Sequence, residues 1–300
     1  MRVFLTGATG FIGSRITGEL LSAGHEVLGL TRSASGAAAL EAAGAVPHRG
    51  DVEDLDSLRA GAADSDAVIH TAFDHDFSRY AANCEKDRRA IAALGEALGR
   101  GDRPLIITSV TGIGSSAPGE PAIEDHLDLA HPIPRVASEQ AGEALKAEGV
   151  NVITVRLPQV HDTVRQGLIS PFVDIARAKG VSAYVGEGAN RFSAAHVSDV
   201  ARLYRLALEK GQRNARYHAV AEEGVTLRAI AEVLGAGLGL PVVSIPADRA
   251  DEHFGYMATF AGLDLIASSA STRDRLGWTP EGPDLLSDLR AMDYAPPAAE

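Results

Sequence analysis

Three glycines near the start of the chain have the spacing of a nucleotide-binding turn. The segment Thr6-Gly7-Ala8-Thr9-Gly10-Phe11-Ile12-Gly13 follows the apolar run Val3–Leu5 and precedes an amphipathic stretch. In such a turn the first glycine permits a tight change of direction, the second lets backbone amides approach a pyrophosphate, and the third lets the helix pack on the strand. The helix N-terminus also favours the negative phosphates. We therefore predict a bound dinucleotide contacted by Gly7, Thr9, Gly10, Phe11, Ile12 and Gly13.

The residues after the second apolar run bear on the choice of cofactor. An acidic side chain at the end of that strand would bind the ribose hydroxyls of NAD, whereas an arginine would accept the additional phosphate of NADP. This chain has Arg32 and Ser33 there. The planar guanidinium of Arg32 suits a phosphate, and Ser33 adds a second donor. The prediction is NADPH, with NADH less favoured; the alternative is that Arg32 is an ordinary solvent-exposed arginine.

Short apolar runs alternate with longer amphipathic stretches, a pattern typical of a parallel sheet covered by helices on both faces. We predict an α/β fold of the Rossmann type, doubly wound, with a smaller C-terminal substrate lobe. Residues 1–160 would form the dinucleotide-binding domain and residues 161–300 the substrate lobe, with a segment at about 190–220 returning to the first domain. The predicted strands are Val3–Thr6, Glu26–Leu30, Val46–His48, Ala67–His70, Leu105–Thr108 and Val152–Arg156.

Composition limits the possible partners. The 300 residues carry a net charge of −12, which argues against nucleic acid and anionic membranes because both would repel the chain. The single cysteine, Cys84, is too few for a structural zinc site, and we predict no metal. The absence of signal-peptide features and of long apolar runs, together with this low cysteine content, leads us to expect a cytoplasmic protein. We expect it to be a monomer or a homodimer.

The spacing of the glycine turn and several later motifs carry a family resemblance. The pattern GxxGxxG resembles that of the short-chain dehydrogenases/reductases, and more narrowly the extended, epimerase/dehydratase-like branch. Two further motifs similar to that branch are His70-Thr71-Ala72 and Ala195-His196-Val197-Ser198-Asp199-Val200-Ala201. The resemblance implies that further residues contact the cofactor, namely Asp51, Val52, His70, Thr71, Ala72, Thr108, Pro158 and Val160. For His70, a packed structural role is the open alternative.

The resemblance also implies a catalytic Ser or Thr and a Tyr-x-x-x-Lys pair, and this chain departs from that pattern. Ser109 falls on the serine position, with Thr108 and Thr111 as less favoured substitutes. Arg135 falls on the tyrosine position and Glu139 on the lysine position. Because the pKa of arginine exceeds about 12, Arg135 is not a proton donor near neutral pH. Arg135 either holds the substrate oxygen or simply pairs with Glu139, four residues later on the same helical face.

Three routes to the missing proton remain. Another acid substitutes, with the loop histidines His126, His131 and His161 as candidates. Alternatively, Ser109 and water suffice for an easily reduced substrate. Our preferred hypothesis is that the substrate carries its own donor, as a ketone flanked by a phenol does, so that the enzyme only positions it.

The leading functional hypothesis is an NADPH-dependent ketoreductase acting on a ketone of a small, aromatic polyketide secondary metabolite. Reductases that lack the tyrosine resemble those of actinomycete aromatic-polyketide pathways, which make antibiotics. The first alternative is a non-catalytic, NADP-binding redox-sensing regulator. The second is a sugar-nucleotide epimerase or dehydratase, for which loss of the tyrosine and lysine would be severe because a sugar hydroxyl is a poor acid.

Overall fold

The computed structural model describes residues 1–295 and is built around one large parallel sheet. Its seven strands pair in the order β10-β6-β5-β4-β1-β2-β3, all parallel. The strands are β1 (Arg2–Thr6), β2 (Glu26–Thr31), β3 (Val46–Arg49), β4 (Ala67–His70), β5 (Pro104–Val110), β6 (Asn151–Leu157) and β10 (Arg216–His218). The chain leaves β1 in one direction and returns to build outward from β4 in the other, which confirms the predicted doubly wound Rossmann-type fold.

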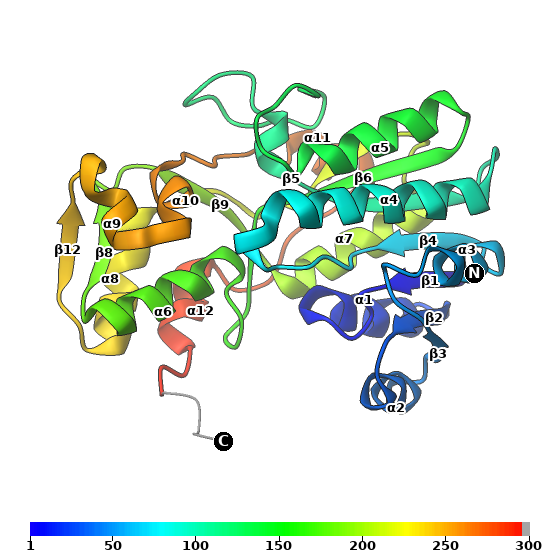
Figure 1. Ribbon diagram of the computed structural model, residues 1–300, viewed down its shortest axis with the longest axis horizontal. Coiled ribbons are helices and arrows are strands. Elements are labelled where there is room, and N and C mark those ends of the chain that lie inside the picture. The colour runs from blue at the N-terminus through cyan, green and yellow to red at the C-terminus, as the bar shows by residue number, and fades with distance from the viewer. Residues whose placement is uncertain (296–300) are drawn as a thin grey trace.

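Helices cover both faces of this sheet, as its buried apolar strands require. One face packs against α1 and α7, and the other against α3, α4 and α5 (Figure 1). The apolar core is therefore divided into two layers by the sheet itself. The helices of this region are α1 (Phe11–Ser22), α2 (Ala34–Ala43), α3 (Leu55–Ala63), α4 (Tyr80–Leu98), α5 (Val136–Ala147) and α7 (Val197–Lys210).

A smaller lobe lies beyond the carboxyl ends of the large sheet's strands, on the left of Figure 1. It contains two minor sheets, one with the order β11-β9-β7 and one pairing β12 with β8. Their strands are β7 (Gln159–His161), β8 (Ser182–Val185), β9 (Arg191–His196), β11 (Glu222–Thr226) and β12 (Val242–Ile245). The remaining helices are α6 (Ser170–Lys179), α8 (Leu227–Leu238), α9 (Ala250–Phe254), α10 (Ala258–Gly262), α11 (Ala270–Leu276) and α12 (Leu285–Ala291).

The six predicted strands of the large sheet are confirmed to within a residue or two at each end. The seventh strand, β10, comes from residues 216–218 and pairs with β6, while α7 packs against α1. The proposed division at residue 160 stays a prediction. Within residues 1–295, no helix is long and apolar enough to cross a membrane.

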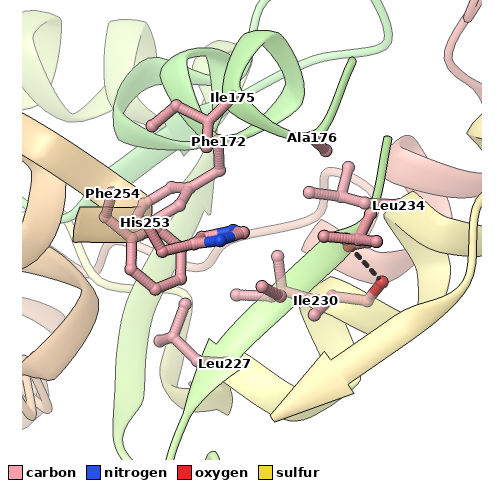
Figure 2. Close-up of a pocket in the computed structure, with 12 residues that line it drawn as sticks. Phe172, Ile175, Ala176, Leu227, Ile230, Leu234, His253 and Phe254 are labelled. Carbon is pink, nitrogen blue, oxygen red and sulfur yellow. Dashed lines mark hydrogen bonds between the residues drawn. The ribbon is translucent and has the colours of Figure 1, made fainter. Parts of the chain in front are cut away.

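One small cavity lies in the interior of the smaller lobe. This cavity of about 10 Å³ lies between α6, α8 and α9, where the rings of Phe172, His253 and Phe254 face aliphatic side chains of α8 (Figure 2). A space of this size holds at most one water molecule. This cavity is therefore too small for a cofactor or a substrate.

Candidate functional site

A cleft of about 1160 Å³ runs along the carboxyl ends of the large sheet's strands and continues against the smaller lobe. This is the edge at which ligands bind in open α/β sheets. Every residue that we predicted to contact a cofactor or substrate lines this cleft except Ser33. The lining residues are Gly7, Thr9, Gly10, Phe11, Ile12, Gly13, Arg32, Asp51, Val52, His70, Thr71, Ala72, Thr108, Ser109, Arg135, Pro158 and Val160.

The glycine turn is shaped as a cradle that side chains would fill. Gly7 has φ of +73°, a left-handed conformation, and a Cβ added there would lie 2.8 Å from the amide nitrogen of Ala72. A Cβ added at Gly13 would lie 1.9 Å from the carbonyl oxygen of Gly7. Gly10 caps α1, and its amide donates to that same oxygen at 2.8 Å. The backbone at Gly13 thus packs directly on that at Gly7, with no side chain covering the start of α1. The amides there can approach a pyrophosphate, so the turn fits a dinucleotide.

Arg32 lies at the rim of the cleft, beyond the end of β2. Its side chain is 80 % exposed, and its Nε lies 3.5 Å from a carboxylate oxygen of Asp51. Ser33 lies outside the cleft lining, and its hydroxyl caps α2 by accepting from the amide of Gly36 at 3.0 Å. Among the two predicted phosphate ligands, Arg32 therefore keeps a free guanidinium edge, while Ser33 has a local structural role.

The arginine at the tyrosine position is fixed by a buried carboxylate. Arg135 begins α5 and places its Nη1 2.6 Å from Asp87 of α4, while its Nη2 donates to the carbonyl oxygen of Thr108 at 3.0 Å. Asp87 also accepts from Ser138 at 2.6 Å and from His70 at 3.1 Å. Although burial alone would raise the pKa of Asp87, the Arg135 guanidinium and these donors hold that pKa below its ordinary value. Arg135 is thus a neutralised, immobile group and not a proton donor.

The glutamate at the lysine position belongs to a second buried ion pair. Arg156 of β6 donates from Nε to Glu139 Oε1 at 2.7 Å and from Nη2 to Oε2 at 2.8 Å. The hydroxyl of Ser109 donates to the same Oε1 at 2.8 Å. A serine hydroxyl has one hydrogen, and here Glu139 accepts it. Ser109 therefore presents acceptor lone pairs to the cleft, and it would have to leave Glu139 before donating to a substrate oxygen.

Arg135 and Glu139 do not pair with each other, so that alternative was wrong. The two side chains are four residues apart on α5, but each has a buried partner from another element. A buried charge requires a partner of opposite sign, and the fold supplies Asp87 to Arg135 and Arg156 to Glu139. The roles of Ser109 and Arg135 in catalysis stay predictions.

The candidate substitutes for the missing acid do not reach the cleft. His161 lies in β7, fully buried, with its Nδ1 2.7 Å from Asp288, and neither His126 nor His131 lines the cleft. None of the three candidate histidines therefore lines the cleft. Thr108 donates to the carbonyl oxygen of His70 at 2.7 Å and lies 2.6 Å from the hydroxyl of Tyr204, so both sides of its hydroxyl are engaged.

His70 has the packed structural role that was the open alternative, and it also lines the cleft. Its ring lies 1 % exposed between Thr6, 2.7 Å from Nδ1, and Asp87, 3.1 Å from Nε2. The same residue contributes to the floor of the cleft. Its side chain is therefore committed to a structural network, and the contact with a cofactor stays a prediction.

Sequence reasoning missed the partners that define this site. Asp87 and Arg156 are charged residues in a helix face and a strand that are otherwise buried. A charge at a buried position needs a partner, so each was a detectable signal of an ion pair. Their partners lie 48 and 17 residues along the chain in Arg135 and Glu139, and this pairing is set by the fold alone.

A buried histidine beside the second ion pair predicts acid sensitivity. His218 is fully buried and lies 3.3 Å from Arg156 Nη1, and burial together with the Arg156 charge lowers its pKa to about 3. The unfolded chain binds a proton near pH 6.5, so unfolding is favoured as pH falls from about 6.5 towards 3. We expect the free energy of unfolding to fall by about 1 kcal/mol per pH unit over this range from His218 alone.

Urea unfolding at pH 7, 6 and 5 measures this effect, with His218→Gln as the comparison because glutamine keeps a donor and an acceptor but does not titrate there. The wild-type protein should lose stability more steeply than the variant. Parallel pH profiles for the two proteins would show that His218 is not the cause.

Comparison with known proteins places the chain in a family. The model of the NAD dependent epimerase/dehydratase family matches residues 3–220. An uncharacterized protein of Schizosaccharomyces pombe is 46 % identical over 98 % of this chain and 100 % of its own length. A ketoreductase of Stigmatella aurantiaca, acting on a 4-hydroxy-2-methyl-3-oxo-4-farnesyl-3,4-dihydroquinoline-1-oxide, is 27 % identical over 85 % of this chain and 80 % of its own.

Among solved structures, UDP-glucose 4-epimerase of Thermotoga maritima with UDP-glucose superposes with a TM-score of 0.75. The match covers 98 % of this chain and 97 % of that chain at 21 % sequence identity, which supports the fold. The glycine cradle, the strand order and the family match agree, and the chain belongs to the NAD-dependent epimerase/dehydratase family, the extended branch of the short-chain dehydrogenases/reductases.

Proposed function

We propose that this protein is an NADPH-dependent carbonyl reductase that reduces a ketone of a small molecule without a catalytic tyrosine. One observation carries the proposal: the tyrosine and lysine positions are occupied by Arg135 and Glu139, and each is held in a separate buried ion pair, with Asp87 and with Arg156. Oxidation of a sugar hydroxyl needs a base there, whereas reduction of an activated ketone needs only positioning and an available proton.

We assign cofactor binding and substrate positioning to different residues of the cleft. The glycine cradle would hold the pyrophosphate, and Arg32 would bind the additional phosphate that distinguishes NADPH from NADH. NADPH supplies a hydride when bound. Ser109 and the Arg135–Asp87 pair shape the space in which the carbonyl lies, and Pro158 with Val160 borders the same space.

The proton is proposed to come from the substrate. A hydroxyl next to the ketone would donate to the carbonyl oxygen and transfer its proton as the alkoxide forms, so the enzyme would need no acid. This fits a hydroxyaryl ketone such as an aromatic polyketide. The family match and the distant ketoreductase relative support a reductase in general, but the polyketide and antibiotic assignment gains no support because the similar fungal relative is uncharacterized.

Among reductases that lack the tyrosine, the chain resembles the angucyclinone ketoreductase of simocyclinone biosynthesis. None of the relatives above is that protein, so the resemblance is unconfirmed. It suggests a class of substrate to test and carries no further weight here.

Two other functions compete. The structural likeness to UDP-glucose 4-epimerase makes an epimerase the second candidate, and fold alone does not separate it from a reductase. A redox sensor that binds NADP without turnover is the third, and the size of the cleft beyond the dinucleotide residues favours an enzyme over it.

The proposal is tested by following the fall in NADPH absorbance with two ketones that differ only in whether they carry a hydroxyl beside the carbonyl. We expect turnover of ortho-hydroxyacetophenone, and a rate lower by about 100-fold or more for ortho-methoxyacetophenone, which lacks the donor, because general acid catalysis contributes at least that factor. Ser109→Ala should keep activity within about threefold, since its hydroxyl hydrogen is already given to Glu139. Arg32→Ala should lower the affinity for NADPH by about tenfold and leave the affinity for NADH unchanged.

Equal rates for the hydroxy and methoxy ketones, or a large loss in Ser109→Ala, would contradict substrate-assisted protonation. Epimerisation of UDP-glucose without net change in nicotinamide absorbance would favour the second candidate. Tight NADPH binding with no turnover across the ketones would favour the sensor.

A further inference from the structure

A group of aromatic side chains lies along the cleft on the side of Arg135. Phe73, His75 and Phe77 occupy alternate positions in the loop between β4 and α4, Tyr80 begins α4, and Phe260 comes from α10 of the smaller lobe. All five line the cleft. They are called the aromatic wall below.

The rings of the aromatic wall contact one another, mostly edge to face, while Phe77 and Tyr80 are tilted at 46°. Phe73 lies 5.3 Å from His75 and 6.2 Å from Tyr80 between ring centroids, with interplanar angles of 80° and 77°. Phe77 lies 5.5 Å from Tyr80 and 5.8 Å from Phe260. The contact between Phe77 and Phe260 joins the loop after β4 to the smaller lobe, so the wall spans the cleft from one lobe to the other.

The backbone that carries the wall is held by polar contacts beneath it. Asn83, which is 1 % exposed, donates from Nδ2 to the carbonyl oxygens of Asp74 and Asp76 at 3.2 and 3.0 Å. Lys86 bridges Asp74 and Glu53. The loop is thereby fixed to α4, yet Phe73, Phe77, Tyr80 and Phe260 remain only half-buried. Apolar rings are thus kept partly in water on a rigid support, which is costly for folding and typical of a binding surface.

The wall adjoins the reacting centre of the cleft. The ring of Phe73 lies 4.1 Å from the guanidinium carbon of Arg135, and Arg135 donates to the carbonyl oxygen of Thr108, the residue before Ser109. Arg32 and Asp51 lie at the ends of β2 and β3, on the opposite half of the sheet from α10 (Figure 1). Asp87 pairs with Arg135, so the guanidinium in contact with the Phe73 ring is not left as an unpaired charge.

We propose that the aromatic wall determines substrate specificity by binding a planar, conjugated ring system, with Phe77 and Phe260 holding it from the two lobes. The identity of the reaction at the bound ring rests on the proposed reductase function. Ring binding itself does not. Saturated ligands, such as the sugar of a nucleotide sugar, have no conjugated ring to stack on or pack edge to face against Phe73, Phe77 and Phe260, so they should gain less from the wall than a planar aromatic ligand.

Calorimetric titration of naphthol into the protein saturated with NADP measures ring binding without turnover. We expect Phe77→Leu and Phe260→Leu each to raise the Kd by about tenfold, because an aromatic contact of this kind is worth about that factor. Phe77→Tyr should restore wild-type binding because it keeps the ring. In the reduction assay, the kcat/KM ratio of tetralone to cyclohexanone should fall by a similar factor in both leucine variants.

Tyr184→Leu serves as the matched control, since Tyr184 of β8 is half-buried outside the cleft lining and packs beneath Arg228. Its Kd for naphthol should equal that of the wild-type protein. The proposal is overturned if the wild-type protein does not bind naphthol, or if the two leucine variants keep both the Kd and the tetralone preference. Weakened naphthol binding in those variants, with no ketone reduced by any form, would uphold the wall and reject the reductase.

Discussion

Glu139→Gln lowers the free energy of unfolding by about 3–5 kcal/mol, because it leaves the Arg156 guanidinium buried without an opposite charge. Both side chains are almost completely shielded, at 0 % and 1 % exposure. The substitution preserves shape, so the loss reports charge and not a cavity. Urea unfolding monitored by circular dichroism measures it. A loss of this size is a large share of the about 5–15 kcal/mol that stabilises a typical domain.

Glu96→Gln is the control for this prediction. Glu96 lies 3.0 Å from Arg59 in an ion pair that is largely exposed to water, so its removal should produce no measurable change. If Glu139→Gln unfolds at the same urea concentration as the wild-type protein, then Arg156 is solvated by some other route and the structural role given to the pair is wrong.

Gly13→Ala should weaken dinucleotide binding by about 10- to 100-fold. The added Cβ would lie 1.9 Å from the carbonyl oxygen of Gly7 and 2.6 Å from its carbonyl carbon, and both are backbone atoms that no side-chain rotation moves aside. Either α1 moves away from β1 or the turn opens, at a cost of about 1–3 kcal/mol. Calorimetric titration with NADPH measures the affinity, and urea unfolding separates it from any loss of stability.

Gly18→Ala tests the same chemical change in the same helix. Gly18 is exposed, and a Cβ there would meet nothing within 4 Å. Alanine should therefore stabilise α1 by about 1 kcal/mol and leave NADPH affinity unchanged. Equal affinities for NADPH in Gly13→Ala and Gly18→Ala would contradict the requirement for a bare backbone at Gly13.

The features that sequence predicted well are local or periodic. The alternation of apolar runs and amphipathic stretches predicted the parallel sheet, because strands buried on both faces must be apolar throughout. The glycine spacing predicted the cradle, since each glycine answers a steric demand within the turn itself. The family resemblance implied that Ser109 lies at the end of the fifth strand, and Ser109 is the next-to-last residue of β5.

The features that the sequence did not predict depend on contacts between distant elements. Spacing along one helix suggested that Arg135 would pair with Glu139, but the fold brings Asp87 to one and Arg156 to the other. Similarly, nothing in the loop of Phe73 and Phe77 indicates that Phe260, far along the chain, completes their wall. A charged residue in a buried segment indicates that an oppositely charged partner lies nearby. The tertiary structure alone determines which residue that partner is.

The two ion pairs of α5 also constrain how this active site can change by mutation. Replacing Glu139 by lysine alone would set two like charges against each other at Arg156, and replacing Arg135 by tyrosine alone would leave Asp87 with one cation fewer. Each single step towards a tyrosine and lysine passes through a protein with an unbalanced interior charge. A change from the present arrangement to a tyrosine and a lysine therefore requires that each residue be replaced together with its buried partner.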